Sequence, residues 1–152
     1  MDIYADVVIV GTGVGGLFAA LNIEPHKKVV LITKSDMESS DSFLAQGGIC
    51  VERDDDDYES YFEDTMKAGH YENRKESVDI MIRSSREIIE DLVSYGVEFE
   101  KKDGEFAYTR EGAHSKPRIL YHEDITGQEI TSKLLERAKE RTAAEFGVVQ
   151  AV

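Results

Sequence analysis

The feature that most constrains this sequence is a glycine-rich turn close to its first residue. The turn reads Gly11-Thr12-Gly13-Val14-Gly15-Gly16 and follows directly on Asp6–Val10, a short run dominated by β-branched residues. Such a run is typical of a parallel strand that is buried on both faces. We therefore expect a strand over residues 6–10 that leads straight into the turn.

The residues after the turn complete a strand–helix–strand unit. Apolar residues between Leu17 and Ile23 predict a compact helix, which Pro25 and the polar residues 26–28 end. Val29–Ile32 predicts the next strand. In this context the glycines let the backbone approach a pyrophosphate, and the N-terminus of the helix attracts its negative charge. The turn therefore predicts dinucleotide binding in a Rossmann-like α/β domain with a parallel sheet flanked by helices.

The end of the second strand departs from the usual pattern of such domains. An acidic residue is expected there, where it would accept hydrogen bonds from the ribose hydroxyls. The sequence has Thr33-Lys34 instead, and the nearest acid, Asp36, lies further on. This difference disfavours a simple NAD-dependent dehydrogenase.

A polar stretch, Thr33–Ser42, then leads into Phe43-Leu44-Ala45-Gln46-Gly47-Gly48, and its length predicts a functional loop. Two adjacent glycines let backbone pass close to a flat ring, and Ser42 and Gln46 have side chains that can hydrogen-bond to it or to a substrate. Thr33-Lys34 together with Ala45-Gln46-Gly47-Gly48 resembles the flavoprotein family of succinate dehydrogenase, fumarate reductase and L-aspartate oxidase.

A third block sharpens the resemblance. Thr109-Arg110-Glu111-Gly112-Ala113-His114-Ser115 is similar to the Thr-Arg-Glu-Gly-Gly-His-Ser block of L-aspartate oxidases, with Ala113 in place of a glycine, and Asp124–Gly127 follows it. Fumarate and succinate enzymes lack an acid at the position of Glu111. Since aspartate carries an ammonium that succinate lacks, a carboxylate here could orient it by a charge-assisted hydrogen bond.

The resemblance implies FAD as the cofactor, bound noncovalently, because Asp41 stands where membrane-bound relatives carry the histidine that bonds to the flavin. The residues it assigns to the cofactor are Gly11, Thr12, Gly13, Val14, Gly15, Gly16, Thr33, Lys34, Asp41, Ser42, Phe43, Leu44, Ala45, Gln46, Gly47 and Gly48. Glu111 is the candidate for substrate orientation. His114 and Arg118 either line an anionic substrate channel or stabilise a loop, and both alternatives stay open.

The implied reaction is oxidation of L-aspartate to iminoaspartate, with oxygen or fumarate as electron acceptor. In the family this supplies quinolinate synthase in NAD biosynthesis. The family's acid/base arginine, its capping domain and its C-terminal helical domain lie beyond residues 1–152, so we expect these residues to form the N-terminal portion of the FAD-binding domain and to have little activity alone. Two alternatives are a non-catalytic FAD-binding fragment and a soluble fumarate reductase-like flavoprotein.

The middle of the chain predicts an inserted helical and hairpin segment. Helical periodicity marks residues 58–68 and 76–95, and alternation around Asp103-Gly104 marks a hairpin over 97–108. A last helix is expected from Thr126, as N-cap, and a strand from 147. The acidic run Asp54–Asp57 is interpreted as a solvated loop before a helix, without a metal.

Composition excludes several classes of function. The net charge of -13 disfavours nucleic acid and anionic lipid surfaces as partners, although backbone amides can still hold a phosphate. The single cysteine, Cys50, cannot form an internal disulfide, and no signal peptide or membrane-length apolar run is seen. These features predict a soluble cytoplasmic protein.

Overall fold

The computed structural model describes residues 4–36, 39–145 and 147–150. The chain divides into two compact units. The first consists of Met1–Gln46 with Gly127–Val152, and the second of Gly47–Thr126.

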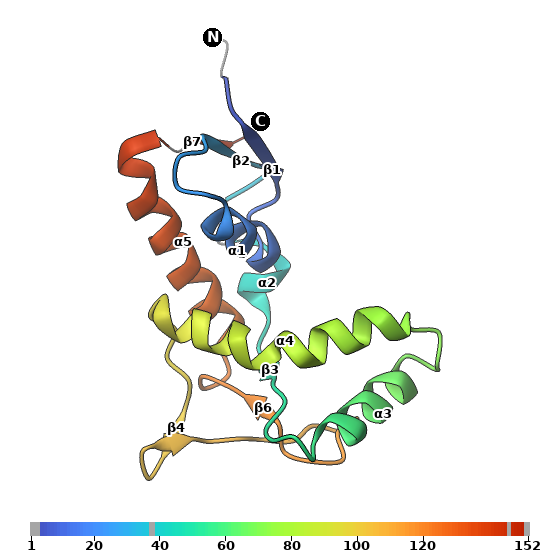
Figure 1. Cartoon of the computed structure of the whole chain (residues 1–152). Helices are drawn as coiled ribbons and strands as arrows, with labels where there is room; N and C mark the ends of the chain where they lie inside the picture. Colours follow the sequence, from blue (N-terminus) through green and yellow to red (C-terminus); the bar gives the residue numbers. More distant parts are fainter. Residues whose placement is uncertain (1–3, 37–38, 146, 151–152) are drawn as a thin grey trace. The chain divides into compact units, whose positions relative to one another are not determined.

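The first unit is the predicted strand–helix–strand fold with a third strand added (Figure 1). Its parallel sheet has the order β1-β2-β7, with Val8 opposite Val30 and Leu31 opposite Val148. The elements are β1 (Val7–Val10), α1 (Val14–Asn22), β2 (Val29–Thr33), α2 (Asp41–Leu44), α5 (Thr126–Glu145) and β7 (Gly147–Gln150). The Rossmann-like α/β prediction is confirmed, and β7 confirms the strand expected from residue 147.

One expectation about β1 is wrong. Val8 and Val10 are 55% and 82% exposed, so the strand is not buried on both faces. Val8 and Val10 are two residues apart and so share one face of β1, and in the described residues this face is left uncovered. β2, by contrast, lies between two strands and is buried along most of its length. β-branched residues are favoured in strands whether one or both faces are covered, and so their presence could not distinguish the two cases.

Arg141 on α5 fixes the C-terminal end of α1. Its guanidinium donates to the carbonyl oxygens of Ala20 at 2.9 Å and Leu21 at 2.8 Å, and also to that of Ile23. The last carbonyls of a helix have no partner within the helix. Arg141 therefore supplies a cap that joins segments more than a hundred residues apart in sequence.

The second unit is built around a pair of helices. α3 (Tyr58–Ala68) and α4 (Lys75–Ser94) form a helical hairpin (Figure 1), packed through Tyr61, Met66, Val78 and Ile82. The remaining elements are short strands: β3 (Ile49–Cys50), β4 (Lys101–Lys102), β5 (Glu105–Phe106) and β6 (Ile119–Leu120). Both predicted helices and the inserted hairpin are thus present.

Two glycine signals act as the sequence predicts. Gly96 has a φ of +97° and follows α4, where its N–H bonds to the carbonyl of Val93 and the next N–H, of Val97, bonds to that of Leu92. This pattern is a Schellman stop. Asp103 and Gly104, with φ of +54° and +88°, join β4 to β5 in the type of two-residue turn that Asp-Gly favours.

The loop after β2 includes the single-turn helix α2, which the sequence did not indicate. The sequence predicts Thr126 as the N-cap of the last helix, whereas in the structure Thr126 is the first residue of α5. The Thr126 hydroxyl accepts a hydrogen bond from the His122 N–H at 2.9 Å. Within the described part of the chain, no helix combines the length and apolar character needed to cross a membrane.

Candidate cofactor and substrate site

The glycines of the turn have different structural roles. Gly11 has a φ of +106°, which favours glycine, and its N–H donates to the Ile32 carbonyl at 2.7 Å. A Cβ on Gly16 would overlap the carbonyl oxygen of Gly11, so glycine is needed where α1 packs against the turn. A Cβ on Gly15 would meet nothing within 4 Å. Gly15 therefore leaves the N-terminal turn of α1 open to a ligand.

The N-terminus of α1 is also where the second motif contacts the first. The N–H of Val14 donates to the Ser42 hydroxyl at 3.1 Å, and a Cβ on Gly13 would lie 3.0 Å from the same oxygen. Ser42 thus satisfies one of the amides that a helix N-terminus leaves without a helical partner. In the structure this side chain ties the loop to the glycine turn.

A pocket of about 440 Å³ lies at the carboxyl ends of β1 and β2. Open α/β sheets bind ligands at this edge, outside the carboxyl ends of the strands. Its lining consists of residues from the glycine turn, the end of β2 and the loop before α2: Val10, Gly11, Thr12, Gly13, Ile32, Thr33, Lys34, Ser35, Asp36, Ser39, Ser40 and Asp41.

Thr33 and Lys34 take different positions at this pocket. The buried Thr33 hydroxyl accepts a hydrogen bond from the Thr12 hydroxyl at 3.2 Å and donates one to the Ser35 carbonyl at 2.9 Å. It holds the turn against the end of β2. Lys34 is exposed at the lining, so its ammonium can reach an anionic ligand there.

The loop that follows is fixed by α2 and by α5. The Ser40 hydroxyl caps α2 by accepting from the Phe43 N–H at 3.2 Å, and Asp41 is exposed in the first turn. The Gly127 N–H donates to the Ala45 carbonyl at 2.9 Å, and a Cβ on Gly127 would overlap the Ser42 carbonyl oxygen. Gly127 was not among the predicted site residues, although its place in the Asp124–Gly127 block was the signal that could have found it.

Residues 42–48, which are predicted to contact the flavin, are called here the predicted flavin loop. Its last residues, Gly47 and Gly48, belong to the second unit and meet the third motif there. A Cβ on Gly48 would overlap the Leu120 carbonyl oxygen, so glycine is required where β3 pairs with β6. Thr109 forms a bridge with Ile119 in the same small ladder. This pairing brings the exposed Glu111 to Gly47, where a Cβ on that glycine would lie 3.7 Å from Glu111 Oε1.

Arg118 lies at the centre of a buried ionic cluster rather than on an open surface. The side chain is fully buried and bonds to both carboxylate oxygens of Asp57, at 2.8 and 3.2 Å, and to Asp64 at 2.6 Å. Burial alone would raise the pKa of Asp57, but hydrogen bonds from Arg118 and Ser60 lower it to about 2. This geometry favours the loop-stabilising alternative for Arg118.

The interpretation of Asp54–Asp57 as a solvated loop is therefore wrong for its last member. Residues 54–56 are exposed, but Asp57 is fully buried. The reason is its partner, Arg118, which is 61 residues away and could not be paired with it from the sequence. A run of like charges shows the composition of a segment but not which member faces inward.

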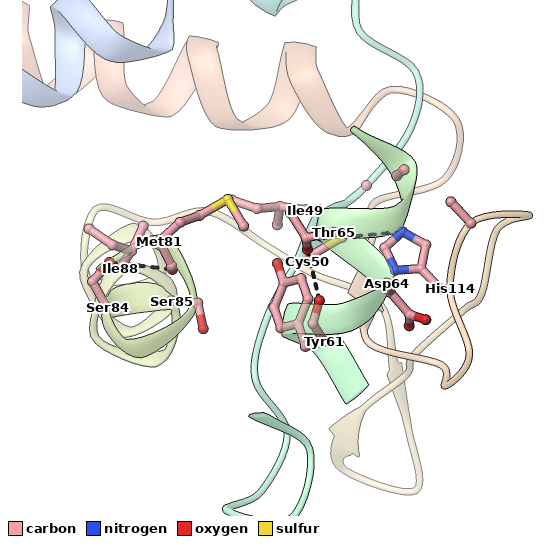
Figure 2. Close-up of a pocket in the computed structure, with 13 residues that line it drawn as sticks. Ile49, Cys50, Tyr61, Asp64, Thr65, Met81, Ser84, Ser85, Ile88 and His114 are labelled. Atoms are coloured by element: carbon pink, nitrogen blue, oxygen red, sulfur yellow. Dashed lines mark hydrogen bonds between the residues drawn. The ribbon is translucent and has the colours of Figure 1, made fainter. Parts of the chain in front are cut away.

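The second unit also has a pocket of about 490 Å³, shown in Figure 2. Its walls are mostly apolar, and Cys50, Tyr61 and His114 contribute sulfur, hydroxyl and imidazole groups to one side. His114 Nε2 lies 3.6 Å from Cys50 Sγ, and burial raises the pKa of the Cys50 thiol. His114 and Glu111 are joined by a turn in which the His114 N–H donates to the Glu111 carbonyl at 3.0 Å.

Comparisons with known proteins identify the family to which the chain belongs. The sequence model of the FAD binding domain family matches residues 6–148. The chain is 44% identical over 137 residues to an L-aspartate oxidase of Clostridium perfringens, covering 90% of this chain and 31% of the relative. It is 42% identical to that of Clostridium acetobutylicum, covering 96% of this chain and 34% of the relative.

A solved structure shares the fold. A mutant of E. coli quinol fumarate reductase FrdA superposes with a TM-score of 0.86 at 26% identity, covering 99% of this chain and 26% of that one. The fold and the glycine turn define a dinucleotide-binding flavoprotein domain. The chain belongs to the FAD binding domain family, an oxidoreductase family whose cofactor is FAD, and it spans about a third of the length of the curated relatives it matches.

Proposed function

We propose that this chain forms the cofactor-binding part of an L-aspartate oxidase, which converts L-aspartate to iminoaspartate. The observation that carries the proposal is the position of Glu111 beside Gly47, because it places an acid of the third motif against the predicted flavin loop. The similarity to L-aspartate oxidases of two Clostridium species supports the same substrate.

Residues of the first unit would hold FAD. The glycine turn and the N-terminal amides of α1 would bind the pyrophosphate, with Gly15 leaving the space for it and Lys34 adding a positive charge at the pocket. Bound FAD would supply the two-electron acceptor for the amino acid. Asp41 offers no imidazole for attachment of the flavin, and this supports noncovalent binding.

Glu111 would recognise the substrate ammonium. An exposed carboxylate beside the flavin loop can accept a charge-assisted hydrogen bond from that group and so orient the Cα–H bond that breaks. Loss of two electrons and two protons gives the imine, and either oxygen, reduced to peroxide, or fumarate, reduced to succinate, would take up the electrons. The imine is a substrate for quinolinate synthase, and the free thiol of Cys50 is compatible with a reducing cytoplasm.

Cofactor binding can be tested on the chain itself. We expect the purified chain to bind FAD with quenching of flavin fluorescence and to release unmodified FAD on acid precipitation. Lys34→Ala should weaken binding, whereas Lys102→Ala, a change in the β4–β5 hairpin, should not. Absence of binding, or flavin that stays with the precipitate, would contradict the proposal.

Substrate recognition can be tested in a chimera in which this chain replaces the matching segment of the Clostridium perfringens enzyme. Glu111→Gln should lower kcat/KM for L-aspartate by roughly 10- to 100-fold, the usual effect of losing a charge-assisted hydrogen bond. Reoxidation of the reduced flavin by fumarate should change little. The matched control is Glu105→Gln, at an exposed carboxylate of β5.

The same chimera distinguishes the alternatives. If Glu111→Gln lowers aspartate oxidation and fumarate reduction equally, Glu111 does not have an ammonium-binding role. Fumarate reduction without aspartate oxidation would favour a fumarate reductase-like flavoprotein. An inactive chimera that still binds FAD would favour a non-catalytic FAD-binding fragment.

A further inference from the structure

The segment that carries Glu111 is attached to α3 by an unusual set of contacts centred on Arg118. Asp64 on α3 accepts from the Ser115 N–H and hydroxyl, both at 2.7 Å, and from Arg118 Nη1 at 2.6 Å. One carboxylate oxygen therefore receives three donors from residues 115 and 118. The Arg118 guanidinium also stacks over the Tyr61 ring, 4.9 Å from its centroid.

Another contact of Arg118 shows which nitrogen of His114 carries the proton. Nη1 lies 3.4 Å from Nδ1 of His114. A guanidinium has only donors and stays protonated in proteins, so Nδ1 must be the acceptor. In a neutral imidazole one nitrogen accepts and the other donates, and so the His114 proton lies on Nε2.

The protonated nitrogen of the His114 ring, Nε2, also has a partner. Nε2 faces Cys50 Sγ at 3.6 Å, and Tyr61 lines the same pocket (Figure 2). Both ring nitrogens of His114 therefore have partners within the second unit, one on β3 and one at the residue directly before β6. His114 acts here as a link between elements, adjacent to the turn that bonds its N–H to the Glu111 carbonyl.

We propose that Arg118 is a positioning residue for Glu111, because it fixes His114 as the Nε2–H tautomer and, through Asp64, holds the 109–119 segment against α3. The proposal rests on the proposed function only for the role of Glu111 toward substrate. The tautomer and the attachment of the segment are properties of the chain by itself.

The tautomer can be measured by NMR on the full chain with ¹⁵N-labelled histidine. We expect His114 to show an unprotonated Nδ1 and a protonated Nε2 at neutral pH. Cys50→Ala removes the acceptor of Nε2 but leaves Arg118 in place, so the same tautomer should persist. If His114 in the unaltered chain carries its proton on Nδ1, or if Cys50→Ala changes the tautomer, then Arg118 does not set it and the proposal is overturned.

A second variant tests Arg118 directly. Arg118→Lys keeps the charge but removes the planar fork, and His114 should then show averaged nitrogen shifts of mixed tautomers. Ser115→Ala is the matched control, because it removes one bond to Asp64 without changing the contact with His114. Should Arg118→Lys fail to fold, the unaltered chain and Cys50→Ala still decide the tautomer.

The effect on Glu111 needs a separate measurement in the chimera. Arg118→Lys should raise KM for L-aspartate about tenfold or more with FAD affinity unchanged, since loss of a charge-assisted contact is of that size. Unchanged KM together with mixed tautomers would overturn the positioning role. A chimera that never oxidises aspartate would instead refute the proposed function and leave the NMR result intact.

Discussion

Gly15 and Gly16 are adjacent in sequence, yet the structure gives them separable roles. A Cβ on Gly16 would overlap the Gly11 carbonyl oxygen, which is backbone and cannot move without opening the turn. A Cβ on Gly15 would meet open space. Gly16 therefore serves the packing of α1, and Gly15 leaves space for the ligand.

We expect Gly16→Ala to destabilise the first unit and to abolish FAD binding. Gly15→Ala should keep or raise stability, because alanine in a helix is favoured over glycine by about 0.5–1 kcal/mol, but it should weaken FAD binding. Urea unfolding with circular dichroism and flavin fluorescence titration would measure the two effects. Equal stability of the two variants would show that the overlap at Gly16 is relieved cheaply.

Asp57 makes the stability of the folded chain depend on pH in the acid range. Its pKa in the fold is about 2, below the ordinary value of 3.8, so the fold favours the ionised form. The stabilisation is fully present above pH 3.8 and is lost as the pH falls toward 2. By linkage this difference corresponds to about 2 kcal/mol.

We therefore expect the free energy of unfolding to fall between pH 4 and pH 2, in step with protonation of Asp57. Asp57→Asn should be less stable at pH 7 by about 3 kcal/mol, since it leaves Arg118 buried with one carboxylate fewer, and should show a flatter acid limb. Asp55→Asn, at an exposed carboxylate of the same run, is the control. Parallel acid limbs for Asp57→Asn and the unaltered chain would contradict this account.

At the scale of elements, α4 illustrates how one face of a helix carries the stability of the second unit. Ile82 is fully buried against α3, whereas Ile80 is 67% exposed. Ile82→Ala should cost about 2–5 kcal/mol, and Ile80→Ala less than about 0.5 kcal/mol. Chemical denaturation of both variants would check this, and similar losses would mean that the face of α4 toward α3 is not the one described.

The helices and turns could be predicted because their causes are local. α4 is marked by apolar residues at helical spacing and by Gly96, and the β4–β5 hairpin by Asp103-Gly104. The glycine turn Gly11–Gly16 is likewise predicted by residues next to each other in the sequence. Each of these signals lies within a few residues of the structure it produces.

The rest could not be predicted because its causes are distant in sequence. The Asp57–Arg118 pair spans 61 residues, and the contact of Ser42 with Val14 spans 28. The exposure of Val10 depends on whether a distant element covers its face of β1, and the need for glycine at position 127 depends on the Ser42 carbonyl. The motifs could be recognised in the sequence, whereas the contacts that hold them together required the structure.

At the scale of the whole molecule, the division into two units separates the pocket at β1 and β2 from the ionic cluster around Arg118. The pocket at β1 and β2 is lined by residues of the first unit, and the cluster around Arg118 belongs to the second. A ligand that binds only the folded form stabilises what it binds by mass action. Binding of FAD should therefore affect the two units unequally.

Hydrogen exchange measures this difference. With FAD at about 100 times its Kd, the expected stabilisation is about 2.7 kcal/mol, so amides in β2 such as that of Leu31 should exchange roughly 100-fold more slowly. Amides in the middle of α4 such as that of Ile82 should slow much less. Equal slowing of amide exchange in β2 and α4 would show that the two units unfold together. The stabilisation of the glycine turn by FAD would then extend to the segment that carries Glu111.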